Sequence, residues 1–299
     1  MNTIDLFAGC GGIRAGMESA GFSTVFANDI EPKAKITYDL NSDCPMTVGD
    51  IREIEDIPEF DCLTGGFPCQ PFSVSGKRLG FNDTRGTLFF RVAELLHENR
   101  PETFLLENVK GMYTHDGGKT FKTIISVLED LGYTVFHRIL NSMDYGVPQN
   151  RERVFIVGFK DKVDFSFPEP VHLSMTVKDL LDDEVDERFY YREDHKHYKP
   201  ISQAVTDPDK VYQWRWSYVR ENKKNVCPTL LASYMQPTLI LTSKGIRGIT
   251  PREAFRLQGF PENFQLPDLP DKVLMHQAGN SVSVPVIHAI AQRIHSRIG

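Results

Sequence analysis

The sequence has few cysteines and no long hydrophobic run, and each absence excludes a class of protein. The five cysteines are odd in number and scattered, with no close pair spaced like metal ligands, which argues against a disulfide framework and a zinc site. No apolar run approaches the roughly 18 residues that span a bilayer, and the first residues lack the charged and apolar regions of a secretory signal. We therefore expect reduced cysteines, no bound metal, no membrane partner and a cytoplasmic location.

Positive charge is also in the minority, with 34 Lys and Arg against 40 Asp and Glu and a formal net charge of −6. For a nucleic-acid-binding protein the distribution of charge matters more than its sum. Residues 179–194 carry eight acids against two bases, so the rest of the chain is neutral overall. Two stretches, 77–91 and 244–256, each carry four bases against one acid and are candidate basic faces.

Hydrophobic patterning along the first 170 residues predicts a doubly wound α/β sheet. Short apolar runs that are typical of strands alternate with amphipathic segments of helical length. Ligands of such sheets bind beyond the carboxyl ends of the strands. The predicted strands are 3–7, 24–27, 62–65, 103–106, 134–140 and 154–159, and the predicted helices are 12–20, 32–40, 87–98 and 119–131.

A change of pattern near residue 170 predicts a second, smaller domain, since residues 180–248 become polar, aromatic and irregular. The regular pattern returns where Thr250 should cap a helix, with Pro251 at its first position. A last helix over residues 284–297 should pack back onto the sheet. We expect one domain made of residues 1–178 and 254–299, and a smaller domain made of residues 179–253.

Small residues follow the first predicted strand, where Gly9, Gly11 and Gly12 would let a ligand approach the backbone at a helix start. A dinucleotide fingerprint would have a third glycine where Arg14 stands, which argues against an NAD oxidoreductase. Asp29, at the end of the second strand, is placed to accept hydrogen bonds from ribose hydroxyls. Asp50 either belongs to the same nucleoside site or is a turn residue.

A cysteine follows the strand 62–65 on a proline-stiffened turn, in Gly66-Phe67-Pro68-Cys69-Gln70-Pro71. Cys69 is a candidate nucleophile, although a cysteine there could also be a small buried hydrophobic residue. Four further motifs accompany it: Phe7-Ala8-Gly9-Cys10-Gly11-Gly12, Glu107-Asn108-Val109, Gln149-Asn150-Arg151-Glu152-Arg153 and Gly279-Asn280-Ser281-Val282. This ordered set resembles the cytosine-C5 DNA methyltransferase family over most of residues 1–170 and 249–290.

The resemblance implies a Rossmann-like sheet that binds S-adenosylmethionine, with residues 179–253 as the target-recognition domain. It assigns the ribose to Asp29, the adenine ring to Ile30 with Ile51 beside it, and the adenine amino group to Asp50. The family often has an aromatic residue in place of Ile30, so stacking on the ring would be weaker here. Further positions in the implied cofactor site are Phe7, Gly9, Gly11, Gly12, Pro68, Leu88 and Asn280.

The resemblance also implies covalent catalysis, because C5 of cytosine becomes nucleophilic only after a thiolate adds to C6. Cys69 would supply the thiolate, and Glu107 would reach N3 and the exocyclic amine as a partly protonated carboxyl. Arg153 would hold the cytosine O2 while Arg151 braces the site. Without the neighbouring motifs, Glu107 could be a capping acid, and the two arginines could be surface residues beside a strand.

This chemistry requires the target base to leave the stacked duplex, so we also expect contacts with the DNA backbone. Thr229 belongs to a Thr-Leu pair that resembles an element of the family's recognition domain. The other candidates follow Cys69 and are Ser73, Ser75, Lys77, Arg78 and Arg85. A further group could contact DNA or, for its aromatic members, form the core of the small domain: Trp214, Arg215, Trp216, Arg220, Lys223 and Lys224.

The sequence thus predicts a cytosine-C5 methyltransferase that acts on a short sequence in double-stranded DNA, for which a monomer is sufficient. A cognate restriction endonuclease would be a further partner. Two alternatives stay open: a transfer-RNA cytosine methyltransferase, which usually has Thr in place of Ser73, and a catalytically silent DNA-binding module.

Overall fold

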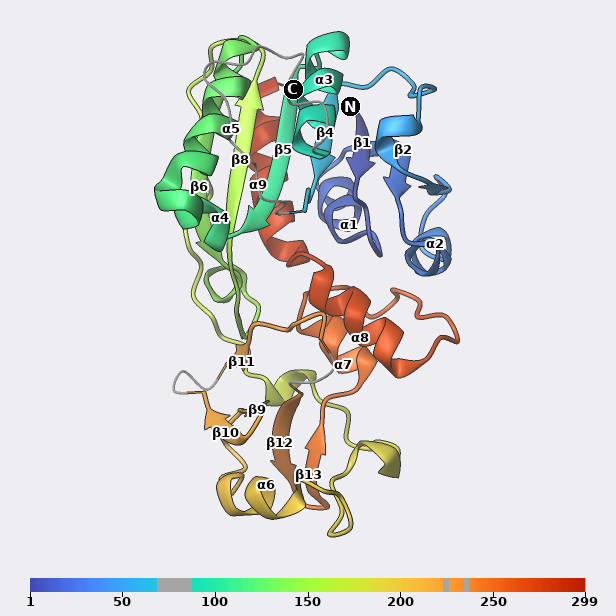
Figure 1. The fold of residues 1–299 in the computed structure, drawn as a ribbon, viewed down its shortest axis with the longest axis vertical. Helices are drawn as coiled ribbons and strands as arrows, with labels where there is room; N and C mark the ends of the chain where they lie inside the picture. The colour runs from blue at the N-terminus through green and yellow to red at the C-terminus, as the bar shows by residue number, and fades with distance from the viewer. Residues whose placement is uncertain (69–87, 223–225, 234–236, 299) are drawn as a thin grey trace. The chain divides into compact units, whose positions relative to one another are not determined.

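The largest element of the fold is a seven-stranded sheet with the order β3-β2-β1-β4-β5-β8-β6 (Figure 1). The computed structural model describes residues 1–68, 88–222, 226–233 and 237–298. Pairing is parallel from β3 through β5, and β8 runs antiparallel to β5. The strands of this sheet are β1 (Asn2–Leu6), β2 (Ser23–Asp29), β3 (Thr47–Val48), β4 (Cys62–Gly65), β5 (Thr103–Val109), β6 (Thr134–Asn141) and β8 (Glu152–Phe159).

Helices cover both faces of this sheet, which confirms the predicted doubly wound α/β fold. Ile4 and Leu6 of β1 share an apolar core with residues of α3 and α5, whereas Asp5, on the opposite face, interacts with Arg14 of α1. Figure 1 shows α9 passing behind β5 and β8. The helices are α1 (Gly12–Ser19), α2 (Pro32–Asp39), α3 (Leu88–Asn99), α4 (Gly111–Thr114), α5 (Lys119–Asp130) and α9 (Val284–Ile298).

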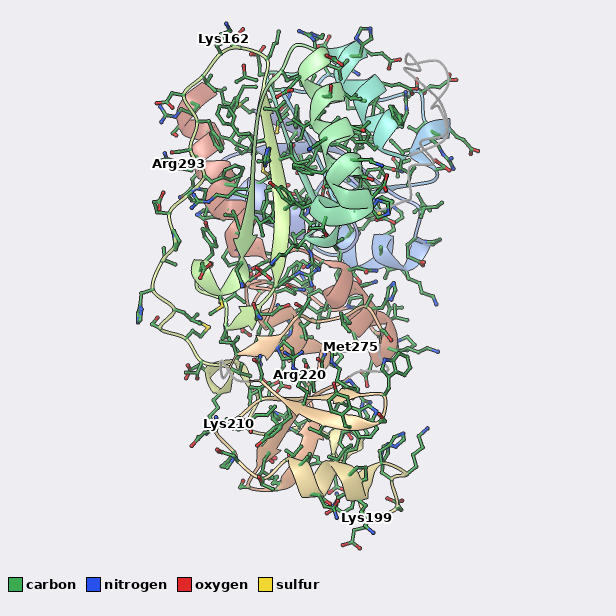
Figure 2. All side chains as sticks on the ribbon, turned by 60° about the vertical axis from the view of Figure 1, so that its left-hand side comes forward. Lys162, Lys199, Lys210, Arg220, Met275 and Arg293 are labelled. Carbon is green, nitrogen blue, oxygen red and sulfur yellow. The ribbon has the colours of Figure 1, made fainter. Side chains whose placement is uncertain are left out.

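The last helix packs back onto the large sheet, as the sequence predicted, and it also contacts α1 near the start of the chain. A Cβ atom added to Gly16 of α1 would lie 2.5 Å from the Cβ of Ile287 in α9, so this approach requires glycine. Arg293 of α9 also donates to the backbone and the hydroxyl of Ser166, at 3.2 Å and 2.7 Å (Figure 2). No helix in the described part of the chain is both long and apolar enough to cross a membrane.

A topological switch point lies at β1, which pairs in parallel with β2 on one side and with β4 on the other. The loops after β1 and β4 therefore diverge, and a crevice forms in such sheets where they part. The glycine loop follows β1, and the segment Gly66-Phe67-Pro68 follows β4. Asp29 is the last residue of β2 and Glu107 lies near the end of β5, so these strands extend further than predicted and include the candidate site residues.

The chain divides into two compact units by its internal contacts. The first contains Met1–Leu140, Glu152–Glu169 and Ile287–Gly299, and the second contains Asn141–Arg151 and Pro170–Val286. The second unit is larger than the predicted small domain, because residues 141–151 and 254–286 belong to it. This division is geometric, and the predicted division by function, with residues 179–253 as a recognition domain, stays a prediction.

The second unit contains a regular four-stranded antiparallel sheet, although the sequence predicted irregular structure there. Its strand order is β10-β9-β12-β13. The sequence did not predict these short strands, because polar and charged residues on one face of the sheet interrupt the apolar runs. The strands are β9 (Tyr212–Arg215), β10 (Tyr218–Glu221), β12 (Thr238–Thr242) and β13 (Gly245–Gly248), and a separate pair joins β7 (Gln149–Asn150) to β11 (Cys227–Pro228). Elsewhere in this unit the helices are α6 (Tyr198–Ala204), α7 (Pro251–Arg256) and α8 (Asp271–Asn280).

Helix α7 begins as predicted, with Thr250 as its N-cap, Pro251 after it and a reciprocal capping box with Glu253. Glu253 is fully buried and forms an ion pair with Arg247, whose Nη2 lies 2.7 Å from Oε1. The same carboxylate accepts from the backbone of Thr250 and of Asp182. These hydrogen bonds compensate the cost of burying the two charges. Five short 3-10 turns complete the described elements: Ile51–Glu53, His115–Gly118, Ser142–Tyr145, Lys178–Leu180 and Glu187–Phe189.

Asp5 is a fully buried acid of β1, the strand that precedes the glycine loop. Its Oδ1 atom accepts from the Thr64 hydroxyl at 3.3 Å, and its Oδ2 atom has no hydrogen-bond partner among the described residues. Burial raises the pKa of Asp5 to about 7, against the lowering effect of the nearby Arg14 charge. The Arg14 guanidinium is itself held by Glu18 at 2.6 Å and lies 5.1 Å from the centre of the Tyr38 ring.

We predict that Asp5 makes the protein less stable as the pH rises from about 4 to about 7. In that window the unfolded carboxyl, with its ordinary pKa of 3.8, has lost its proton while the folded carboxyl keeps it. The free energy of unfolding should therefore fall by a few kcal/mol at most across the window, and Asp5→Asn should remove this dependence. Urea unfolding at several pH values measures the effect, with the exposed Asp43→Asn as the control. Equal pH dependence in the Asp5→Asn and Asp43→Asn proteins would contradict it.

Candidate active site

The Asp29 carboxylate is fixed at the end of β2 by two backbone groups. Gly9 N–H donates to its Oδ2 atom at 2.8 Å, and Glu31 N–H donates to its Oδ1 atom at 2.9 Å. Gly9 has φ of 55°, and a Cβ atom there would meet nothing within 4 Å. The backbone above Gly9 is therefore open to a ligand, and Asp29 keeps lone pairs for hydroxyl donors.

The predicted neighbours of the cofactor beside Asp29 are Ile30, Ile51 and Asp50, and they differ in exposure and in partners. Ile30 is 69% exposed, whereas Ile51 is 2% exposed and belongs to the core, so Ile30 offers the accessible apolar surface. Asp50 follows β3 and forms an ion pair with Arg52, which lowers the pKa of Asp50 to about 2. Its carboxylate also accepts from the Arg52 backbone N–H at 3.0 Å. Asp50 therefore has the geometry predicted for a turn residue, and its charge is paired with the Arg52 guanidinium.

The other predicted cofactor residues of the first unit surround the loop after β1 and the starts of two helices. Phe7 has φ of 57°, unusual for a bulky residue, and it packs on the core. Gly11, at φ of 91°, is the N-cap of α1, and Gly12 begins that helix. Pro68 is exposed after β4, and Leu88 is half-buried at the start of α3.

Glu107 and Arg153 face each other across the paired strands β5 and β8. The Arg153 Nε atom lies 3.0 Å from Glu107 Oε1, and both side chains are largely buried. Burial lowers the pKa of Arg153, although the Glu107 charge opposes that shift. A Cβ atom on Gly66 would lie 3.3 Å from Glu107 Oε2, so the carboxylate borders the segment that leads to Cys69.

Asn108 holds that same segment in place. Its amide donates to the Phe67 carbonyl at 2.8 Å, so the end of β5 is tied to the chain after β4. Similarly, the Asn28 amide donates to the carbonyls of Thr47 and Gly49, at 3.0 Å and 2.9 Å, and positions the loop that carries Asp50. Neither asparagine was predicted from the sequence to have a role, although each adjoins a predicted site acid, and that adjacency was the available signal.

Several predicted site residues lie outside the described residues: Cys69, Ser73, Ser75, Lys77, Arg78 and Arg85. Three of the cysteines that the structure describes have the properties of core residues, and the fourth, Cys44, is half-buried. Burial raises the pKa of the Cys62 and Cys227 thiols to about 12, and Cys10 is also buried. Within the described ranges, no group of three or more His, Cys, Asp or Glu is arranged to hold a metal ion.

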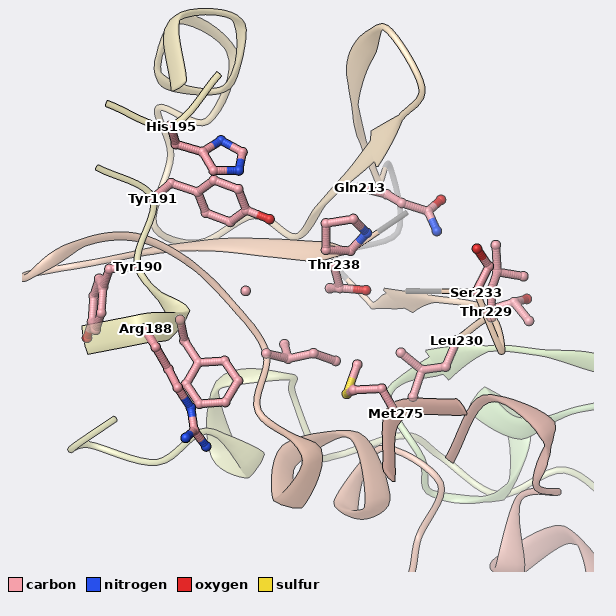
Figure 3. Close-up of a pocket in the computed structure, with 15 residues that line it drawn as sticks. Arg188, Tyr190, Tyr191, His195, Gln213, Thr229, Leu230, Ser233, Thr238 and Met275 are labelled. Atoms are coloured by element: carbon pink, nitrogen blue, oxygen red, sulfur yellow. The ribbon is translucent and has the colours of Figure 1, made fainter. Parts of the chain in front are cut away.

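Three predicted site residues belong to the second unit. Arg151 is 2% exposed, and its guanidinium donates to the carbonyls of Leu230, Gly279 and Ser281. Arg151 therefore braces backbone within the second unit, and its predicted role in bracing the catalytic site stays a prediction. Thr229 donates its hydroxyl to the Asn150 carbonyl at 2.7 Å and lines a cavity (Figure 3). Asn280, which is exposed, has its amide nitrogen 2.9 Å from His276 Nε2.

Gln149 is a buried residue of the second unit for which the sequence predicted no role. Its amide donates to the Leu257 carbonyl at 2.6 Å, and its oxygen accepts from the Leu230 backbone at 3.1 Å. Gly279 permits a similarly close approach, because a Cβ atom there would lie 2.4 Å from the Leu231 backbone. Both residues stand in motifs that the sequence analysis quoted, but their partners are distant in the chain.

The chain is similar to known proteins along nearly its whole length. The model of the family described as C-5 cytosine-specific DNA methylase matches residues 1–296. Type II methyltransferase M.Bsp6I of Bacillus sp. (strain RFL6) is 48% identical over 305 residues, which cover 97% of each chain. Type II methyltransferase M.HaeII of Haemophilus aegyptius is 44% identical over 293 residues, which cover 97% of this chain and 91% of that protein.

Solved structures share the fold. The Dnmt2 methyltransferase of S. pombe has a TM-score of 0.77 at 21% identity, with 99% of each chain covered. A putative DNA modification methyltransferase encoded within an E. coli prophage has a TM-score of 0.75 at 25% identity, also with 99% of each chain covered. Because the family matches nearly the whole sequence, this chain belongs to the C-5 cytosine-specific DNA methylase family and is a DNA (cytosine-5-)-methyltransferase that uses S-adenosylmethionine as its methyl donor.

Proposed function

We propose that Cys69, Glu107 and Arg153 carry out the methylation, with Cys69 as the covalent nucleophile. The observation that carries this proposal is the convergence of Glu107 with the segment before Cys69: Gly66 borders the Glu107 carboxylate, and Asn108 anchors Phe67. A thiolate at Cys69 adds to C6 of the cytosine, which makes C5 nucleophilic. After methyl transfer, a base removes the C5 proton and the Cys69 thiolate leaves as the ring regains its double bond.

The Glu107–Arg153 ion pair supports the prediction that these two side chains contact different atoms of the same cytosine. Glu107 contacts N3 and the exocyclic amine, while Arg153 contacts the cytosine O2. With no base bound, Arg153 neutralises Glu107 at 3.0 Å, and it can transfer part of its hydrogen bonding to O2 when the base enters. The water-poor surroundings of both side chains strengthen these contacts.

S-adenosylmethionine fits the residues at the ends of β1, β2 and β3, where it supplies an electrophilic methyl group. The fixed Asp29 carboxylate suits two ribose hydroxyls, the open backbone at Gly9 admits the ligand, and exposed Ile30 suits an adenine ring. Asp50 would accept from the adenine amino group while it keeps its ion pair with Arg52. The proposed site also includes Phe7, Gly11, Gly12, Ile51, Pro68, Leu88 and Asn280.

We assign target recognition to residues 179–253 and positioning of that region to Arg151. The target base leaves the duplex and enters the site, with Thr229 near the DNA backbone. The proposed phosphate contacts on the loop after Cys69 are Ser73, Ser75, Lys77, Arg78 and Arg85. Relatives of this chain are Type II methyltransferases, which supports a short DNA target, a cytoplasmic location and a cognate restriction endonuclease that acts on the same sequence.

The covalent step predicts a trapped complex on DNA that carries 5-fluorocytosine at the target. Fluorine cannot leave C5 as a cation, so the enzyme should stall after methyl transfer with Cys69 bonded to C6. Mass spectrometry of the denatured complex should find the cross-linked peptide containing Cys69, formed in the presence of S-adenosylmethionine. Cys69→Ser should abolish both the adduct and methylation, with cofactor binding nearly unchanged.

Two outcomes would overturn this assignment: a cross-linked peptide without Cys69, or methylation of ordinary DNA with no adduct on the substituted DNA. Cys62→Ser is the matched control, because Cys62 is fully buried in β4 and should leave the adduct in place. Preferential trapping on substituted RNA would instead favour the transfer-RNA alternative, and the absence of any methylation or adduct would favour a silent binding module.

Loss of the Asp29 carboxylate should weaken binding of S-adenosylmethionine. Asp29→Ala removes the acceptor for ribose hydroxyls and leaves the Gly9 and Glu31 N–H groups without it, at a cost of roughly 1 to 3 kcal/mol in binding. We expect Asp50→Ala to have an effect of similar size. Calorimetric titration measures both, with exposed Asp43→Ala as the control. Unchanged affinity in Asp29→Ala and Asp50→Ala would place the cofactor elsewhere.

A further inference from the structure

The small sheet of the second unit has one apolar face and one polar face. In the register of β9 with its neighbours, Gln213 is directly opposite Arg220 on β10 and Thr238 on β12. Residues that are directly opposite point to the same face of a sheet, so these three side chains share a face with Arg215, two positions along. The other face carries Tyr212, Trp214 and Leu239, which pack in one core with Ile201 of α6.

Two cavities border the polar face, and Gln213 lines both. One, of about 330 Å³, is lined by Gln213, Arg215, Arg220, Thr229 and two asparagines, Asn150 and Asn222, together with Pro228 and Leu231. The other, of about 190 Å³, is shown in Figure 3, where the Gln213 amide lies at the same end as Thr229 and Ser233. No Asp or Glu is among the described residues that line either cavity.

Gln213 and Arg220 have hydrogen-bonding groups that the described part of the protein does not use. Gln213 is 4% exposed, and its side-chain amide has no hydrogen-bond partner among the described residues. Arg220 is exposed (Figure 2), and its guanidinium makes no ion pair or hydrogen bond within the described ranges. The Gln213 amide atoms are not among the fully buried polar atoms that lack a partner in the described residues, so a ligand in the cavities that Gln213 lines can hydrogen-bond to them.

We propose that Gln213 and Arg220 read the edges of bases in the DNA target and so determine part of its sequence. A guanidinium can donate two hydrogen bonds to O6 and N7 of guanine, and a Gln amide can both donate to N7 and accept from N6 of adenine. A phosphate group has no hydrogen-bond donor for the oxygen of the Gln213 amide to accept from. The edge of a base offers both donors and acceptors, so it can use both ends of the amide. Because opposite side chains on paired strands are about 5 Å apart at Cβ, the two residues contact the same base pair or adjacent ones.

This inference rests on the proposed role of residues 179–253 in target recognition. The test is bisulfite sequencing of a random duplex DNA pool after methylation by the full chain with S-adenosylmethionine. Arg220→Gln should relax the requirement for guanine at one position of the target by roughly 10- to 100-fold in relative rate, with other positions unchanged. Gln213→Leu should relax the same position or its neighbour.

Lys199→Ala is the matched control, because it also removes one positive charge from the second unit. Lys199 is exposed on α6 (Figure 2), which packs against the opposite, apolar face of the sheet. We expect this variant to keep the preference of the unmodified protein at every position. Thermal melting and cofactor titration check that Gln213→Leu is folded, and the exposed Arg220 decides the test if it is not.

Unchanged target preference in Arg220→Gln would overturn the proposal. So would an equal loss of rate on all sequences with a weaker dependence on salt, since that result identifies Arg220 as a phosphate contact. If the unmodified chain methylated no DNA, the enzymatic function itself would fail, which is a different outcome from a methylating enzyme whose variants keep their preference.

Discussion

Parallel pairing of β1 with both β2 and β4 is the constraint on which the active site depends. It makes the loops after β1 and β4 diverge, and it brings the carboxyl ends of the neighbouring strands to one edge of the sheet. Side chains then fasten these loops to the strands. Asp29 holds the glycine loop through Gly9, and Asn108 holds the segment before Cys69 through Phe67. The site is thus built from loops that rigid strands position.

Buried polar side chains perform the corresponding task in the second unit. Arg151 and Gln149 hydrogen-bond to backbone groups that follow more than 70 residues later, and the Arg247–Glu253 pair holds the start of α7. Such groups are costly to bury unless every polar atom is used, and removing one partner leaves the other unsatisfied. The motif from Gln149 to Arg153 therefore contributes a brace to one unit and, two residues later, the side chain to which we assign a base contact in the other.

The groups that we assign to DNA chemistry differ from these braces in how they are partnered. Arg153 and Glu107 form an ion pair that an entering base can share, and Arg153 also donates to the Glu152 carbonyl. Gln213 and Arg220 have no partner among the described residues, although their neighbours on the opposite face form a closed core. The bracing residues Arg151 and Gln149 each make several hydrogen bonds to distant backbone groups, whereas the residues that we assign to recognition keep hydrogen-bonding groups for the substrate.

Local patterns in the sequence determined the strands and helices of the large sheet, the capping box at Thr250, and the placing of Asp29 and Glu107 at strand ends, because period, caps and turns depend on residues close in the chain. Tertiary structure decided which residues are buried and which segments pack together, because local patterns carry no information about distant parts of the chain. It buried Asp5 and Ile51 and assigned residues 141–151 to the second unit. It also formed the regular four-stranded sheet of the second unit. The polar residues on one face of that sheet interrupt the apolar pattern by which strands are predicted. Each of these outcomes depends on which distant segments pack together, and Gln149 and Leu257, 108 residues apart, show the distance involved.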